Sequence, residues 1–218
     1  MRSSSRSCGS CRRAATWPRS SGRPSCHLTR AGPSERYQSV LEDAAAQRIA
    51  ARVRYFSAGR GAEGARHVSV HRVVIGPPAR IIATCHRSGT LKWFRIDNVF
   101  EARLDEHEPF RPAAPADVAT FHDASLDGFH QDGPTEVLSF FVRDPEARWV
   151  ARNLLPGMRP EEIDGGIRVT AETTAILQVA RYLAGLGEAA RPESPRLASC
   201  VLALAEGTLR SARARAND

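Results

Sequence analysis

The stretch that decides the fold is residues 80–99, which reads Arg-Ile-Ile-Ala-Thr-Cys-His-Arg-Ser-Gly-Thr-Leu-Lys-Trp-Phe-Arg-Ile-Asp-Asn-Val. Two runs rich in apolar residues, 80–86 and 90–96, flank the turn-forming triplet Arg87-Ser88-Gly89, a pattern typical of a β-hairpin. Side chains alternate across a strand, so the polar residues of the first run share one face and Cys85 lies on the other. We therefore expect Cys85 in a core, and Arg80 and His86 in a groove or in solvent.

Short strands continue on both sides of this hairpin. Residues 53–57, 66–75 and 99–104 are rich in valine and aromatic residues and are separated by glycine-bearing turns. Apolar residues at helical spacing predict a helix from about 35 to 50, with Ser34 as its cap. Five short strands within about 55 residues favour a small antiparallel β-barrel.

The chain changes character after Pro109. Prolines mark a linker over 111–133, in which 116–129 is a predicted helix. A second unit, 134–212, follows, and its expected strands and helices alternate: strand 136–142, helix 145–155, strand 166–171, helix 172–186, strand 189–192 and helix 194–211. This order predicts an α+β sandwich of ferredoxin-like type, so the fold class as a whole is α+β.

Residues 1–34 are expected to form a disordered basic tail, because they lack apolar periodicity and are rich in Ser, Arg, Gly and Pro. Cys8, Cys11, Cys26 and His27 lack the second close ligand pair of a zinc site, so we predict no metal. An odd count of five cysteines argues against a disulfide framework. No run is long enough for a membrane span or a secretory signal, and we expect a cytoplasmic protein.

The net charge of +7 is concentrated in two places. The first 40 residues hold eight arginines and one acid, and residues 51–104 hold ten basic side chains and three acids. An anionic partner is therefore expected at the tail or at the barrel, where forked arginine donors suit phosphate. Trp93 and Phe94 fall on opposite faces, so one of them could stack on a base while the other enters the core.

The barrel segment resembles a known family. Its order is a leading helix, the strand Val53-Arg54-Tyr55-Phe56, a valine-rich strand, an apolar strand ending in Cys85-His86, and then Lys92-Trp93-Phe94-Arg95-Ile96-Asp97-Asn98-Val99. This is similar to the WYL domain of bacterial transcriptional regulators, and the stretch 179–209 resembles the C-terminal extension of that family. The Trp-Tyr-Leu triplet corresponds to Ala79-Arg80-Ile81 here, and Asn98 stands in the place of an arginine.

The resemblance implies an SH3-like WYL barrel with its leading helix over 35–110, acting as a ligand-sensing regulatory domain. It implies transcription regulation by effector binding, with a nucleotide or a single-stranded nucleic acid held in a basic groove. The residues that we expect to line this groove are Arg95, Lys92, Arg80, Arg66, His86 and Tyr55. We expect a transcriptional partner or DNA-binding subunit, leave a homodimer open, and expect no cofactor.

The sequence argues against one other function and leaves a second open. An enzyme is not expected: neighbours on a strand point apart, so Cys85 and His86 cannot act as a nucleophile–base pair, and no catalytic or phosphate-loop motif is present. The alternative is an oligomerisation or protein-interaction module that binds no ligand, because the naming triplet and one arginine are missing. The family usually carries a helix-turn-helix domain, so this chain is expected either to act alone or to have lost that domain.

Overall fold

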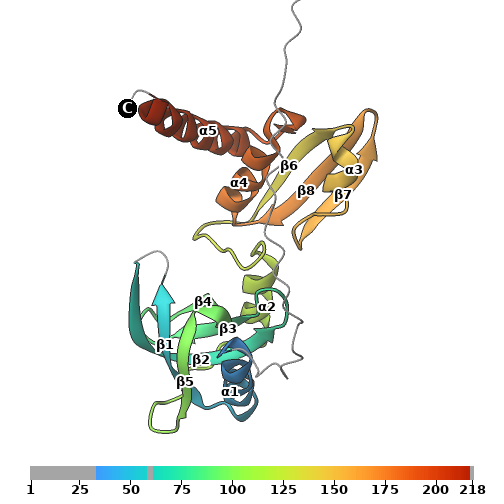
Figure 1. Ribbon diagram of the computed structural model, residues 1–218. Coiled ribbons are helices and arrows are strands. Elements are labelled where there is room, and N and C mark those ends of the chain that lie inside the picture. Colours follow the sequence, from blue (N-terminus) through green and yellow to red (C-terminus); the bar gives the residue numbers. More distant parts are fainter. Residues whose placement is uncertain (1–32, 58–60, 217–218) are drawn as a thin grey trace, which may run out of the picture. The chain divides into compact units, whose positions relative to one another are not determined.

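The computed structural model describes residues 33–57 and 61–216 of the chain (Figure 1). The predicted basic tail lies outside these residues except for Pro33 and Ser34. Cys8, Cys11, Cys26 and His27, for which no zinc site was predicted, lie outside them as well. The described part is α+β, with two antiparallel sheets and five α-helices. None of these helices is long and apolar enough to cross a membrane.

The first sheet contains all five strands expected around the 80–99 hairpin. Helix α1 (Pro33–Gln47) precedes β1 (Ala50–Ser57), β2 (Ala62–Val74), β3 (Arg80–Cys85), β4 (Thr90–Arg95), the 3₁₀ turn η2 (Ile96–Asn98) and β5 (Val99–Asp105). The strand order is β4-β3-β2-β1-β5, so β4 and β5 are edges that do not pair. The expected barrel therefore does not close.

One side-chain contact joins β4 to the far part of this sheet. The Arg95 N–H donates to the Tyr55 hydroxyl of β1 over 3.4 Å, whereas the bond from the Ile96 N–H to the Ala79 carbonyl only extends the β3–β4 ladder. A single contact satisfies far fewer backbone groups than a ladder between β4 and β5 would.

Helix α1 covers one face of the first sheet. Leu41 and Ala44 of the helix are fully buried and belong to one apolar cluster with Val53, Val68 and Ile81. Cys85 is 2% exposed in the same cluster, as its strand parity predicted, and Phe94 lies beside it. Of the aromatic pair, Phe94 is therefore the residue that enters the core.

Arg80 and His86, on the opposite face of β3, were expected in a groove or in solvent, and for His86 this expectation was wrong, because its side chain is only 5% exposed. The middle of this face is also buried. Ile82 is fully buried and Thr84 is 8% exposed. The chain after β5 runs across this face, where the Trp93 indole N–H donates to Ser125 Oγ over 2.8 Å and the ring packs near Phe121. Strand alternation identified the two faces correctly, but the burial of the second face depends on a segment distant in sequence.

The linker helix is shorter than predicted. Helix α2 spans Pro115–Asp123, and its one buried residue is Val118. The next residues form a two-residue turn, because Leu126 and Phe129 pair across Asp127 and Gly128. Both turn residues have positive φ, +50° and +74°, and Asp-Gly is a preferred sequence for such a turn.

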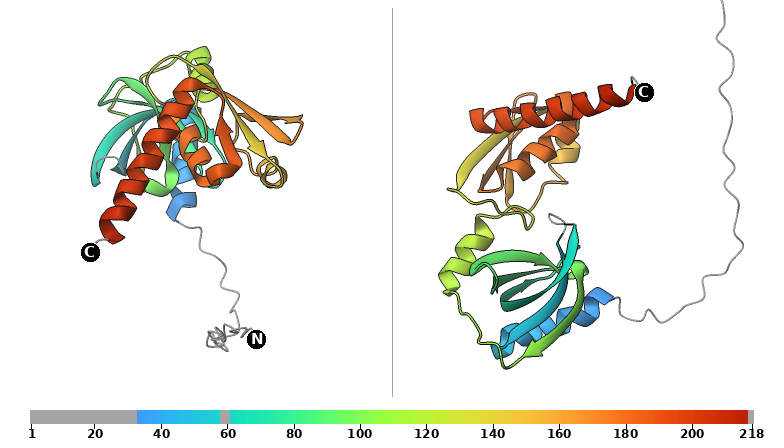
Figure 2. Two further views of the ribbon diagram at one scale, coloured as in Figure 1. Left: turned by 90° about the horizontal axis from the view of Figure 1, so that it is seen from above. Right: turned by 90° about the vertical axis from the view of Figure 1, so that its left-hand side faces the viewer.

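The second sheet has four strands in the order β7-β8-β6-β9. Its elements are β6 (Glu136–Arg143), α3 (Glu146–Val150), β7 (Met158–Ile163), β8 (Gly166–Thr173), α4 (Ile176–Leu186), the 3₁₀ turn η3 (Gly187–Ala189), β9 (Ala190–Pro192) and α5 (Pro195–Ala216). Buried residues of α3, α4 and α5 share one core with alternate residues of β6, including Leu138, Phe140 and Val142. Figure 2 shows α4 and α5 packed together.

Strand β7 was not predicted from the sequence. It reads Met-Arg-Pro-Glu-Glu-Ile, and only its first residue is buried. A charged strand containing proline is tolerated at the edge of a sheet, which is where β7 lies. Helices α3 and α4 are also shorter than predicted, ending at Val150 and starting at Ile176 respectively.

A cationic cleft on the first sheet as the candidate functional site

A cleft of about 850 Å³ lies on the first sheet and contains five of the six predicted site residues. Tyr55, Arg66, Arg80, Lys92 and Arg95 all line it. The rest of its wall is formed by Ser57, Cys85, Arg87, Ser88, Trp93, Phe94, Asn98, Gly128 and Phe129. Residues that are up to 74 positions apart in the sequence, from Tyr55 to Phe129, therefore meet at one surface.

The lining of the cleft is cationic and partly aromatic. Five basic side chains reach it, from Arg66, Arg80, Arg87, Lys92 and Arg95, and no carboxylate belongs to its lining. Tyr55 packs edge-on against Phe94 with ring centroids 5.2 Å apart, and Phe129 is 43% exposed. Such a surface attracts anions and offers ring faces for a base.

The strand register explains why these cations converge. Val53 lies opposite Arg66 in the β1–β2 pair, and Val68 lies opposite Cys85 in the β2–β3 pair. Lys92 lies opposite Ala83, two residues before Cys85 on the same face. Directly paired residues point to one side of a sheet, so Arg66, Lys92 and Cys85 share the face that Val53 and Ala83 occupy.

Two of the five cations already have an acidic partner. Arg95 donates to Asp97 from Nε over 3.0 Å and again from Nη2, a bidentate pair. These hydrogen bonds raise the pKa of Arg95 and lower the pKa of Asp97. Arg80 Nη2 lies 3.0 Å from Asp127 Oδ1, and the Arg80 side chain is only 14% exposed.

The pKa of the Cys85 thiol reflects the charges and hydrogen bonds at one end of the cleft. Burial alone raises the pKa of a thiol. Hydrogen bonds from the backbone of Ser88 and Arg87 and from the Ser88 side chain, with the charge of Lys92, outweigh this effect and lower the pKa of Cys85. The turn after β3 therefore favours a negative charge.

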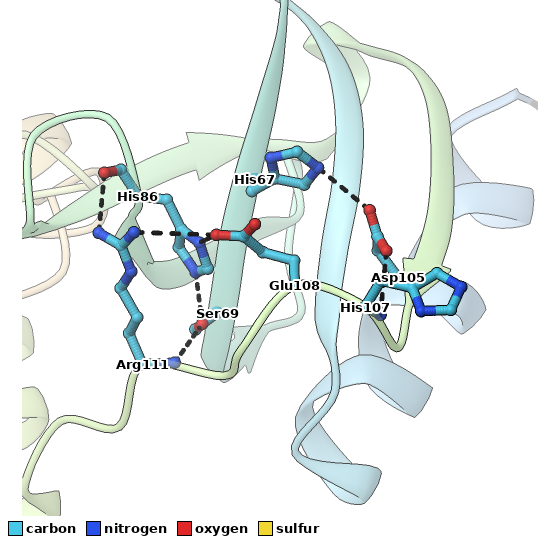
Figure 3. A network of polar contacts seen from close by, with 7 residues as sticks. All are labelled: His67, Ser69, His86, Asp105, His107, Glu108 and Arg111. Carbon is cyan, nitrogen blue, oxygen red and sulfur yellow. Dashed lines mark hydrogen bonds and ion pairs between the residues drawn. The ribbon is translucent and has the colours of Figure 1, made fainter.

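His86, the sixth predicted site residue, lies outside the cleft in a separate polar network (Figure 3). Its side chain is 5% exposed, its Nδ1 is 2.7 Å from Glu108 Oε1, and its Nε2 is 2.8 Å from Ser69 Oγ. The Arg111 N–H donates to Ser69 Oγ over 2.8 Å, and the Arg111 guanidinium donates to the His86 carbonyl over 2.9 Å. His86 thus ties β2 and β3 to the chain after β5.

The side chains of Ser69, His86 and Glu108 have the hydrogen-bond order of a nucleophile–base–acid relay. However, Ser69 is fully buried, and a substrate could reach its hydroxyl only if the segment from Glu108 to Arg111 moved away. In the state described by the structure, the trio fastens that segment to the sheet. We call Ser69, His86, Glu108 and Arg111 the clasp.

Sequence reasoning missed the clasp and the partner of Arg80. Ser69 and Arg111 are 42 residues apart, and Asp127 follows Arg80 by 47 positions in a different segment. The basic residues were found because a charge excess is visible without a fold, whereas a partner distant in sequence is not. Among residues 33–57 and 61–216, no group of three or more His, Cys, Asp or Glu side chains could hold a metal ion.

Comparison with known proteins finds similarity only among solved structures. No protein-family model and no curated protein sequence matches the chain. Proteasome accessory factor B/C of Arthrobacter aurescens is 16% identical with a TM-score of 0.35, over 78% of this chain and 26% of that one. A CRISPR Cas-related protein is 11% identical with a TM-score of 0.48, over 82% of this chain and 55% of that one. This chain spans about a quarter and about half of the two, and at these values neither likeness identifies a function.

Proposed function

We propose that this chain is a WYL-type regulatory protein whose cleft binds an anionic effector, either a nucleotide or a single-stranded nucleic acid. The observation that carries the proposal is the cleft itself, whose lining has five cations, four aromatic rings and no carboxylate. Stacking and phosphate contacts together are the usual means of holding unpaired nucleotides. Binding shifts the population of conformations and requires no bond-making step, so the protein is not an enzyme in this proposal.

We propose a fold type for each of the two sheets with its helices. The first sheet with its leading helix corresponds to an SH3-like WYL domain. The second unit corresponds to a ferredoxin-like fold, an assignment supported by the order strand–helix–strand–strand–helix–strand and by the sheet order β7-β8-β6-β9. The effector signal would pass to a transcriptional partner or a DNA-binding subunit in the cytoplasm.

A ligand-free interaction module is the second candidate, and helix α5 favours it. Leu202 is 59% exposed and Leu209 is 48% exposed on this helix. Exposed large apolar residues on one element are a feature of protein interfaces. In that function the cations of the cleft would be solvated surface charges with no ligand.

Binding of a labelled short oligothymidylate to the full chain, followed by fluorescence anisotropy across a salt series, separates the two candidates. We expect binding that weakens with salt and is reduced about tenfold or more by Lys92→Glu, because phosphate contacts dominate such affinities. The matched control is Arg103→Glu, which reverses an exposed charge on β5 outside the cleft. Equal loss in both variants, or no binding at low salt, would support the interaction module.

A further inference from the structure

The five cations of the cleft differ in whether a carboxylate already neutralises them. Arg80 is paired with Asp127, and Arg95 is paired with Asp97. The other three, Arg66, Arg87 and Lys92, form no ion pair with an acid within the described part of the chain. A ligand can engage these three without breaking an existing ion pair.

These three cations come from neighbouring positions around the turn after β3. The His86 N–H donates to the His67 carbonyl over 3.0 Å, which extends the β2–β3 ladder by one pair before the turn that contains Arg87. Arg66 lies on β2 beside the start of this turn, and Lys92 lies on the next strand, β4. All three side chains line the same cleft, so a ligand in the cleft can meet them together.

Two further observations favour binding of an anion at this end of the cleft. The Cys85 thiol, in the middle of the three cations, is polarised toward its anionic form by the turn and by Lys92. Arg87, Ser88 and Lys92 are all exposed, so a ligand can approach them from solvent. The other end is closed off by the Asp127–Gly128 turn, whose Gly128 lies against the Arg80 side chain.

Resting on the proposed function, we propose that Arg66, Arg87 and Lys92 form a phosphate subsite that holds a terminal phosphate of the effector. Arg80 and Arg95 are positioning residues that shape the cleft and keep their own carboxylates. In this proposal the main contacts to the phosphate come from three residues around the turn and not from Arg95.

The number of cations indicates which phosphate the subsite prefers. A phosphomonoester carries a charge of about −1.5 to −2 near neutral pH, whereas a phosphodiester carries one charge. A subsite with three unpaired cations should bind the monoester more tightly than the diester, because the additional negative charge of the monoester can form a further charge-assisted hydrogen bond. A nucleic acid with a 5′-phosphate end should therefore bind more tightly than the same strand with a 5′-hydroxyl end.

The test compares two oligothymidylates, labelled at the 3′ end and differing only in the 5′-phosphate, on the full chain and its variants. We expect the wild type to prefer the phosphorylated strand by about tenfold, and Arg66→Gln, Arg87→Gln and Lys92→Gln each to reduce this preference severalfold. Arg80→Gln and Arg95→Gln should keep the preference, and Lys92→Arg should retain most of it. Arg103→Gln serves as the matched exposed control, and thermal melting checks that every variant is folded.

The outcomes separate this inference from the function on which it rests. If the wild type binds both strands equally, or if Arg95→Gln and not Lys92→Gln removes the preference, the phosphate subsite is wrong while the anion cleft stands. If the wild type binds neither strand at low salt, the proposed function fails and the subsite fails with it. Inorganic phosphate should compete with the phosphorylated strand more strongly than chloride does at equal ionic strength, and equal competition would also count against the subsite.

Discussion

Replacing Ser69 by alanine should destabilise the protein, because this one hydroxyl joins both sides of the clasp. Ser69 is fully buried, and its Oγ accepts the Arg111 N–H over 2.8 Å and is hydrogen-bonded to His86 Nε2 at 2.8 Å. Each intramolecular hydrogen bond contributes about 1 kcal/mol, and a buried donor left unpaired costs about 1–3 kcal/mol. The free energy of unfolding should therefore fall by about 2–4 kcal/mol.

Urea unfolding measures this loss, and a thermal scan should show Tm lower by roughly 5–15 °C for a chain of this size. Hydrogen exchange gives a local readout, because the Arg111 amide should lose protection while amides in the second sheet keep theirs. Ser88→Ala is the matched control, since Ser88 is exposed in the turn after β3 and its hydroxyl contacts Thr90 at 2.9 Å and the Cys85 thiol, away from the clasp. A Ser69→Ala protein as stable as the Ser88→Ala protein would refute the clasp as a fastening of this segment.

Three further predictions concern other positions. Gly128→Ala should lower the free energy of unfolding by about 1–2 kcal/mol because of the positive φ at this position, and by more because the new Cβ would lie 2.5 Å from Arg80 Cδ. Urea unfolding measures this loss, and adding Arg80→Ala should relieve only the contribution of the clash. Asp127→Asn should release Arg80, which lowers the free energy of unfolding by about 1–3 kcal/mol and tightens oligothymidylate binding severalfold, as measured by anisotropy. Unchanged affinity would contradict the view that Asp127 keeps Arg80 from the ligand. Burial and the charge of Arg48 lower the pKa of His71, so on acidification the imidazole is protonated in the unfolded chain before it is protonated in the folded one, and the free energy of unfolding should fall as pH drops below about 6.5. His71→Asn should flatten this dependence when unfolding is measured against pH, and an unaltered dependence would refute the prediction.

Much of the fold follows from local pattern. The hairpin over 80–99, the three strands around it and the leading helix are all present where local pattern predicted them, although β1 and β2 begin three and four residues earlier and α1 ends three residues earlier than predicted. Alternation also predicted correctly that Cys85 enters the core, because the side-chain period of a strand depends on the chain alone. Charge counting located the cleft for the same reason, since the basic excess of 51–104 is a property of composition.

Local pattern failed wherever a distant segment decides the environment. Strand β7 carries few apolar residues and is a strand because it pairs with the edge of β8, which no periodicity within Met158–Ile163 shows. Trp149 of α3 is 58% exposed, although so large an apolar side chain is usually packed in a core. The sheet was expected to close, yet η2 carries the chain from β4 to β5 without pairing the two strands.

For the candidate site, the sequence by itself determined which residues carry positive charge and on which strands they lie. Only the tertiary structure decided which of those charges are free. Arg80 meets Asp127 from the linker, His86 meets Glu108 and Ser69, and both arrangements depend on where the segment after β5 lies. The physical reason is that charge is a property of a residue, whereas the pairing and burial of that charge depend on contacts between residues far apart in the sequence.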